Sequence, residues 1–315
     1  MPLRLLRSLG QLIITLFVAT VILFLLLRVM PGDPALVALG VNATPEALDE
    51  WRERYGLDRQ LVVQYLEWVG GLLRGDFGDS YVLRENISAL VLDRTQVTMI
   101  LAISAMTIAI VVAVPLGTIV AVRHRKASGA VISGISQVGV AVPNFLVGVL
   151  LIALFSVNLG WFPAGGWVAP TEDFGEFLRR ITLPVLALGS VQASVMTRYV
   201  RSAVLEIMRE DFLRTARAKG YTSGAALVRH GLRNAGIPIM TVIGVQLATL
   251  LISAVVIERV FAIPGLGSLL VDSVANRDLI AVQGVGVMLV VLVILINFLV
   301  EMTYSLVDPR LRKAA

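Results

Sequence analysis

Six stretches of 17 or more residues in this chain contain no Asp, Glu, Lys or Arg, and this lack of charge is what most limits the folds open to it. A helix needs about 20 apolar residues to cross the hydrocarbon core of a bilayer, and five of the six stretches are long enough. Hydrophobic residues make up 57% of the 315 residues, so few polar positions interrupt these runs. The sequence therefore predicts an all-α polytopic membrane protein. The stretches are residues 8–27, 95–122, 127–171, 181–197, 234–257 and 279–300.

The fourth stretch is the shortest, and it contains Pro184, Ser190 and Gln192. The charges that flank it decide whether it crosses the membrane. Residues 198–233 hold eight Lys and Arg residues against three acids, and cytoplasmic loops of membrane proteins carry an excess of positive charge. Only six transmembrane helices put these residues, the basic loop 123–126 and both basic termini on one side. We therefore expect six spans, with the N- and C-termini in the cytoplasm.

This pattern divides the chain into successive parts. They are a first transmembrane helix over 1–30, a small external helical subdomain over 31–94, a five-helix core over 95–308 with a cytoplasmic coupling loop at 205–234, and a basic cytoplasmic tail over 309–315.

Two helices are predicted in the external subdomain. Thr44 and Pro45 are typical of a helix start and Gly56 of a helix end, which predicts a helix over 45–55. A second helix is predicted over 61–74, where apolar residues recur at helical spacing. Its predicted apolar face is formed by Val62, Tyr65, Leu66, Val69 and Leu73.

The coupling loop contains a short segment, 210–220, whose two ends carry helix signals. Asp211 is suited to cap the first turn, and Gly220 can end the helix in the left-handed conformation that glycine adopts at low cost. Small side chains at Ala216 and Ala218 leave room for another protein. An ordinary basic loop and a helix that receives force from a soluble partner both fit this pattern. The candidate contact residues are Asp211, Arg214, Ala216, Arg217 and Gly220.

Several kinds of catalytic chemistry are excluded by residues that the chain lacks. It has no Cys, and its only histidines, His124 and His230, lie in predicted cytoplasmic loops. The zinc-protease motif His-Glu-x-x-His, the Gly-x-Ser-x-Gly motif and the phosphate-binding loop are all absent. We therefore expect no catalytic residue, no metal site and no ATP hydrolysis in this chain. The net charge of +5 reflects membrane topology and not nucleic-acid binding.

Uncharged polar side chains lie within the predicted spans, whose middles carry no charged residue. Such side chains serve contacts between helices, and they can equally line a wet path for a solute. Both interpretations are open at this point. The candidates for lining a path are Gln137, Asn144, Gln192, Gln246 and Asn297.

Charged residues near the ends of the spans and one proline inside a span complete the pattern. Arg28, Glu258 and Glu301 lie near span ends, and we expect their charged groups to reach the membrane interface. Pro143 lies inside the third span. Because proline lacks an N–H and its ring clashes with the preceding turn, we expect a kink there.

A series of short motifs runs along the whole chain. They are Pro31-Gly32-Asp33-Pro34, Gly56-Leu57-Asp58 with Gln64-Tyr65, Gly75-Asp76-Phe77-Gly78-Asp79-Ser80, Val142-Pro143-Asn144-Phe145, Pro163-Ala164-Gly165-Gly166, Ala216-Arg217-Ala218-Lys219-Gly220 with His230-Gly231-Leu232-Arg233-Asn234, Phe261-x-x-Pro264-Gly265-Leu266-Gly267, and Asp308-Pro309-Arg310. Through these motifs, in this order, the chain resembles the transmembrane permease subunits of ATP-binding-cassette importers in the dipeptide, oligopeptide and nickel group. It is most similar to the B-type subunit of that group.

The resemblance implies the fold of a type I importer permease. In such importers the coupling loop docks as a helix in a groove of an ATPase subunit, and of its signature only Ala216 and Gly220 match here. The implied partners are a second homologous permease subunit, two ATPase subunits that bind ATP and Mg, an extracytoplasmic solute-binding protein and the lipid bilayer. The implied location is the cytoplasmic (inner) membrane.

The resemblance also implies the function, which is to form half of a translocation path for di- or oligopeptides. An importer of nickel, a metal chelate or another small solute has the same fold and motifs, and this alternative is open. A stand-alone carrier or channel is the alternative from another class. Such a protein would function without nucleotide and without partners.

Overall fold

The computed structural model of the protein describes residues 2–29, 34–40 and 43–307. In this part of the chain the regular structure is helical, apart from one isolated bridge between Asp79 and Asn86. The predicted all-α fold class is confirmed. Most of the motif at 31–34 lies outside the described residues, as do the closing motif at 308–310 and the predicted tail.

The chain forms two compact units, and each unit brings together segments that are distant in sequence. The core unit comprises Thr98–Ile263 and the chain from Leu295 onward. The N-terminal unit comprises Pro2–Val97 and Pro264–Ile294. The segment predicted as an external subdomain therefore shares a unit with the first helix and with the first half of the last one.

The N-terminal unit contains the two helices predicted after the first span. The Thr44 hydroxyl accepts a hydrogen bond from the Ala47 N–H at 3.3 Å, and Gly56 has a φ of 63°, so α3 starts and ends as predicted. A further helix, α12, follows the short connection after α11. The helices of this unit are α1 (Pro2–Val29), α2 (Pro34–Leu39), α3 (Pro45–Arg54), α4 (Leu61–Leu72) and α12 (Leu266–Ala275).

The predicted apolar face of α4 is covered only in part. Val62, Leu66 and Leu73 on that face are exposed. The helix packs on α1 through another residue of the face, Tyr65, whose ring centroid lies 5.5 Å from that of Phe24. Helical spacing identifies an apolar stripe, but the aromatic contacts with α1 decide which part of α4 is covered.

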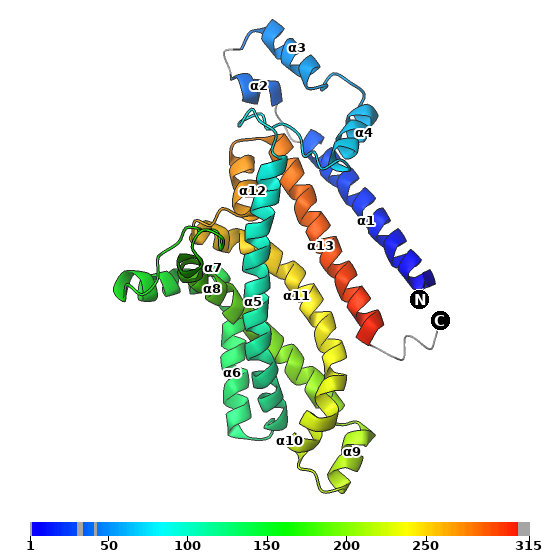
Figure 1. The fold of residues 1–315 in the computed structure, drawn as a ribbon, viewed down its shortest axis with the longest axis vertical. Helices are drawn as coiled ribbons and strands as arrows, with labels where there is room; N and C mark the ends of the chain where they lie inside the picture. The colour runs from blue at the N-terminus through cyan, green and yellow to red at the C-terminus, as the bar shows by residue number, and fades with distance from the viewer. Residues whose placement is uncertain (1, 30–33, 41–42, 308–315) are drawn as a thin grey trace. The chain divides into compact units, whose positions relative to one another are not determined.

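The core unit is built around α8, which packs against α6, α7 and α11 (Figure 1). Segments η1 and η2 are wider turns of π-helix that continue α7 and precede α11. The elements are α5 (Ser88–Val122), α6 (Ala127–Ala141), α7 (Asn144–Leu151), η1 (Ile152–Asn158), α8 (Phe174–Ile207), α9 (Asp211–Ala218), α10 (Ser223–Ala226), η2 (Leu227–Gly231), α11 (Leu232–Val260) and α13 (Leu279–Val307), with the starts of α5 and α13 in the N-terminal unit.

The predicted kink at Pro143 is confirmed, and it is a complete break. Helix α6 ends at Ala141, α7 begins at Asn144, and the two helical segments are bent by 97°. Proline removes a backbone donor and disfavours helical conformation in the residue before it, so the chain turns at Val142 and Pro143.

The number of helices that can cross a membrane depends on α8. Four described helices are long and apolar enough, namely α1, α5, α11 and α13, and the bent pair of α6 with α7 and η1 makes a fifth if it counts as one span. Helix α8 is not in this set, because polar residues such as Gln192 interrupt its apolar run. At 34 residues it is nevertheless about 50 Å long, enough to cross. With α8 included, the count is the six that the sequence predicts.

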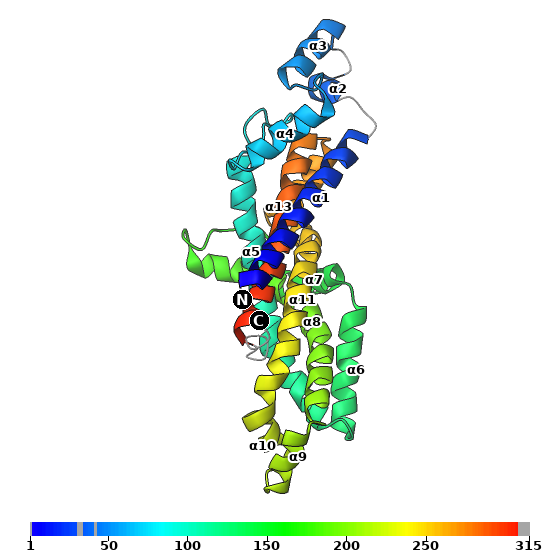
Figure 2. The same ribbon diagram turned by 90° about the vertical axis from the view of Figure 1, so that its right-hand side faces the viewer.

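The ends of the core unit support the inclusion of α8. Figures 1 and 2 show the α5–α6 connection, α9 and α10 together at one end of this unit. The loop that enters α8, residues 159–173, lies at the other end of that helix. Helix α8 thus runs from one end of the core unit to the other. The two basic loops, the α5–α6 connection and the loop that contains α9 and α10, lie at the same end.

Close packing of α5 on α8 at Gly117 gives a first prediction. A methyl group at Gly117 would lie 2.7 Å from Val200 Cβ and 2.9 Å from the Thr197 carbonyl oxygen. Gly117→Ala is therefore expected to lower the melting temperature of the purified protein, with a cost of about 1–3 kcal/mol. Gly134→Ala is the matched control, since a methyl group there meets nothing within 4 Å. Equal melting temperatures for the two variants would contradict this packing.

Candidate functional site

Helix α9 is the predicted coupling segment, and it is an amphipathic helix held by its apolar side. Leu213 and Ala216 are buried in an apolar cluster. The cluster also contains Val204 of α8, Leu227 of η2 and Ile239 of α11. One short helix therefore shares an apolar cluster with both long helices that flank the coupling loop, and it lies against α10 and η2, the latter leading into α11.

The predicted capping role of Asp211 is wrong, because Glu210 occupies the cap position without a side-chain hydrogen bond. The Asp211 carboxylate lies in the first turn, where the helix dipole favours it, 3.3 Å from Arg214 Nη1. Ala216 is only 8% exposed, so most of its side chain is covered by its own chain.

The end of α9 and its exposed face agree with the prediction. Helix α9 ends at Ala218 with Lys219 as its C-cap, and Gly220, which follows directly, has a φ of 95°. Arg214 and Arg217 are exposed, which leaves a basic surface for a partner. Phe212, a large apolar residue that is 39% exposed on the same helix, was not among the predicted contact residues. An aromatic residue in a polar loop was the signal that could have found it.

Two of the candidate path-lining residues meet each other. Gln192 Nε2 of α8 donates a hydrogen bond to Gln246 Oε1 of α11 at 2.9 Å. Gln192 is buried. Within a membrane a hydrogen bond between two such side chains helps to hold the helices together. This contact accounts for both residues without a solute.

The other three candidates lie apart. Gln137 of α6 is exposed and borders a hollow between α6 and α8. Asn144 is the first residue of α7 and is half-buried, and Asn297 is exposed on α13. The five candidates therefore do not form one common lining.

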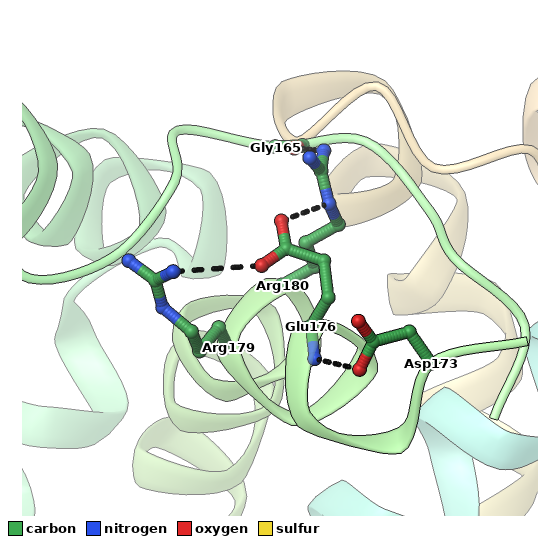
Figure 3. A network of polar contacts seen from close by, with 5 residues as sticks. All are labelled: Gly165, Asp173, Glu176, Arg179 and Arg180. Carbon is green, nitrogen blue, oxygen red and sulfur yellow. Dashed lines mark hydrogen bonds and ion pairs between the residues drawn. The ribbon is translucent and has the colours of Figure 1, made fainter.

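A polar network ties the loop before α8 to the helix (Figure 3). Asp173 caps α8 by accepting a hydrogen bond from the Glu176 N–H at 2.9 Å. Arg180 donates through Nε to Glu176 Oε1 at 2.8 Å and through Nη1 to the Gly165 carbonyl at 2.9 Å. Arg179 Nη1 lies 3.5 Å from the second carboxylate oxygen of Glu176.

The same loop contacts the turn after α11, which joins two of the motifs noted in the sequence. The Gly166 N–H donates to the Phe261 carbonyl at 2.8 Å. A Cβ at Gly165 would lie 2.2 Å from that carbonyl oxygen, so only glycine fits. Phe261 is 1% exposed, and its ring packs against Gly148 of α7. The motifs at 163–166 and 261–267 are therefore two sides of one contact.

The expectation for Glu258 is wrong. Its side chain is fully buried, and it accepts a hydrogen bond from the Thr98 hydroxyl at 2.6 Å. The carboxylate thus joins α11 to α5 and does not reach the membrane interface. The side chains of Arg28 and Glu301 lie outside the described residues.

A second motif is explained within the N-terminal unit, where residues 75–80 form a tight loop. Asp76 Oδ1 accepts hydrogen bonds from Asn86 Nδ2 at 2.7 Å and from the Gly78 N–H at 2.9 Å. The Ser80 hydroxyl donates to buried Asp278, which also caps α13. The Asn86 amide, more than the Gly78 N–H, holds the pKa of Asp76 below its usual value.

Comparison with known families identifies the class of protein. Residues 113–313 match the family described as a binding-protein-dependent transport system inner membrane component. Residues 2–102 match the N-terminal part described for membrane components of such systems. The chain belongs to this family of binding-protein-dependent transport permeases, and its apolar helices embed it in a membrane.

Curated relatives match along nearly the whole chain. The oligopeptide transport system permease protein AppB of Bacillus subtilis is 35% identical, over 93% of this chain and 93% of the relative. The di/tripeptide transport system permease protein DppB of Pseudomonas aeruginosa is 38% identical, over 97% of each. A putative peptide transport system permease protein of Brucella abortus is 37% identical, over 98% of each.

Among solved structures, the fold resembles a chain of the MetNI methionine ABC transporter in an inward-facing conformation. The TM-score is 0.60 at 20% identity, and the match covers 70% of this chain and 98% of that chain. At this identity the match supports the fold alone, which is that of a type I importer permease.

The loop at Asp76 gives a prediction for pH dependence. Because the pKa of Asp76 is lowered in the folded protein, its ionised form adds stability above its unfolded pKa of about 3.9, and this stability is lost as the pH falls through the folded pKa. Asn86→Ala is expected to raise that pKa, as measured by the pH titration of the Asp76 carboxyl carbon by NMR. Arg74→Gln is the control and should raise it less, because the Arg74 charge is the smallest of the influences. An unchanged titration midpoint in Asn86→Ala would contradict the assignment.

Proposed function

We propose that this chain is a permease subunit of an ATP-driven importer of di- and oligopeptides. It forms half of the translocation path, and a second homologous permease subunit forms the other half. Two ATPase subunits bind ATP and Mg and hydrolyse the nucleotide, while an extracytoplasmic solute-binding protein delivers the peptide. The chain itself catalyses no reaction. It lies in the cytoplasmic (inner) membrane with both termini in the cytoplasm.

The peptide substrate is supported by the relatives named for peptide, oligopeptide or di/tripeptide transport, which match along almost the whole length of the chain. The coupling role is supported by one structural observation above all. Helix α9 presents a basic face with Phe212 outward, while its apolar side is buried in a cluster that also contains residues of α8, η2 and α11. A solvent-facing helix anchored in this way can pass a displacement into the spans without unfolding.

The mechanism follows from this anchoring. When the ATPase subunits close on ATP, they move α9, and the cluster around Leu213 moves α8 and α11 with it. The permease pair then changes between inward-open and outward-open states. To move such an equilibrium from 1:99 to 99:1, the partners must favour one state by about 5.5 kcal/mol.

An importer of nickel or of a metal chelate is the second candidate, because the same fold and family motifs serve both kinds of solute. The complete transporter in proteoliposomes separates the two. We expect the transporter to take up a labelled dipeptide. Excess unlabelled tripeptide should reduce this uptake, and nickel should leave it unchanged. Uptake of nickel chelate without uptake of dipeptide would contradict the peptide substrate. Uptake by the purified chain alone, without nucleotide, would instead indicate a stand-alone carrier or channel.

The role of α9 gives a separate prediction. Phe212→Ser removes the exposed aromatic ring, and buried aromatic contacts at protein interfaces often contribute about 2 kcal/mol, or about 30-fold in affinity. We therefore expect fewer ATPase subunits to co-purify with this variant and ATP-dependent uptake to fall. The measurements are the ratio of subunits after affinity purification and the initial rate of uptake.

Val228→Ser is the matched control for this test. Val228 is an apolar residue, 66% exposed, in η2 and outside α9. The control variant should keep its ATPase subunits. Equal loss in both variants, or no loss in Phe212→Ser, would contradict docking through α9.

A further inference from the structure

A polar hollow lies between α6 and α8 in the core unit, away from the Gln192–Gln246 contact. Its lining includes Ser133 and Gln137 of α6 and Ser194, Thr197, Arg198 and Arg201 of α8. None of the residues that line it is acidic. A second hollow shares Ser133, Gln137 and Arg201 and extends to His124, at the end of the unit where the basic α5–α6 connection lies. This part of the spans therefore has a polar lining that carries positive and no negative side chains.

The two guanidinium groups of the hollow have no carboxylate partner among the described residues. Arg201 is half-buried, and its Nε is buried without a hydrogen-bond partner there. Arg198, one turn earlier on the same face, is exposed. A buried N–H without a partner is costly, and a guanidinium binds an oxyanion through paired hydrogen bonds. The geometry around Arg201 thus favours an anionic ligand.

The remaining polar groups divide into those that can donate to a ligand and those that cannot. The hydroxyls of Ser194 and Thr197 donate to backbone carbonyls of α8, at 3.1 Å and 2.7 Å. In the described part of the chain, the side chains of Ser133 and Gln137 make no hydrogen bond. Donors from Arg198, Arg201, Ser133 and Gln137 therefore surround the hollow, which suits an acceptor-only group such as a carboxylate.

We propose that this hollow binds the C-terminal carboxylate of the peptide during its passage through the cytoplasmic half of the path. The proposal rests on the proposed function as a peptide permease. A phosphate of an anionic lipid has similar chemistry, but a lipid headgroup needs donors only at the membrane surface. Here the polar face of α8 continues inward from Arg198 through Ser194 to exposed Ser190, at successive turns. Because this row of polar groups extends from the membrane surface towards its middle, it favours a water-soluble solute over a lipid headgroup.

The test uses the complete transporter in proteoliposomes and the initial uptake rate of labelled alanyl-phenylalanine. Arg201→Gln removes the charge and should lower uptake at least tenfold, whereas Arg201→Lys should retain at least one third of the wild-type rate. Arg179→Gln is the matched control on the same helix, far from the hollow, and should transport at the wild-type rate. Melting temperatures of all variants identify any loss of folding.

A second pair of variants tests the same site without removing an arginine. Ser133→Asp places a carboxylate in the hollow, where it would neutralise the guanidinium groups, and should lower uptake at least tenfold. Ser133→Asn has a side chain of the same size without the charge, and its rate should be at least five times that of Ser133→Asp. Equal rates for the two would overturn the proposal.

Liposome composition distinguishes the peptide from a lipid. All rates are measured in phosphatidylcholine alone and in phosphatidylcholine with phosphatidylglycerol. If the ligand is the peptide, the defect of Arg201→Gln is the same in both. A wild-type rate that falls to the variant's rate when phosphatidylglycerol is omitted would overturn the proposal in favour of a lipid phosphate.

The same measurements separate this inference from the proposed function. Wild-type uptake of dipeptide with Arg201→Gln and Ser133→Asp at the wild-type rate would overturn the carboxylate site and leave the peptide permease standing. Absence of dipeptide uptake by the wild-type transporter, with uptake of a nickel chelate, would overturn the proposed function itself.

Discussion

Close contact between α8 and its neighbours is the constraint on which the core unit depends. Lipid chains are as apolar as the side chains of the spans, so the hydrophobic effect does not drive transmembrane helices together. Their association depends instead on close packing, which small residues permit. Gly117 of α5 faces Val200, Gly189 of α8 faces the Ala105 carbonyl, and Gly139 of α6 leaves no room beside Ser194. The Gln192–Gln246 hydrogen bond adds a polar contact between α8 and α11. The spans therefore form a unit that can transmit a displacement.

That packing explains how a short helix outside the spans can act on them. Leu213 and Ala216 of α9 are buried in the same cluster as Val200 and Val204 of α8. The cluster continues to Ile239 of α11. A helix of eight residues is too short to be stable alone in water. Its conformation is held by this contact, and for the same reason its movement is coupled to two spans.

At the other end of α8, three contacts hold the core unit together. The loop at 163–166 lies backbone to backbone on Phe261, and Arg180 holds that loop from α8. Glu258 joins α5 to α11 through Thr98. With α9 at one end and these contacts at the other, α8 and α11 are fixed to each other near both ends.

The sequence by itself determined the positions of the apolar helices, the excess of positive charge in the loops, the break at Pro143 and the end of α9 at Gly220. These features depend on local properties, namely the length of apolar runs, the excess of Lys and Arg, and the backbone limits of proline and glycine. Only the tertiary structure decided that Ala216 and Glu258 are buried, that Gln192 contacts Gln246, and that Val62 on α4 is exposed. Residue spacing defines a face of a helix, but burial of that face depends on residues far away in the chain, such as the 54 positions that separate the two glutamines.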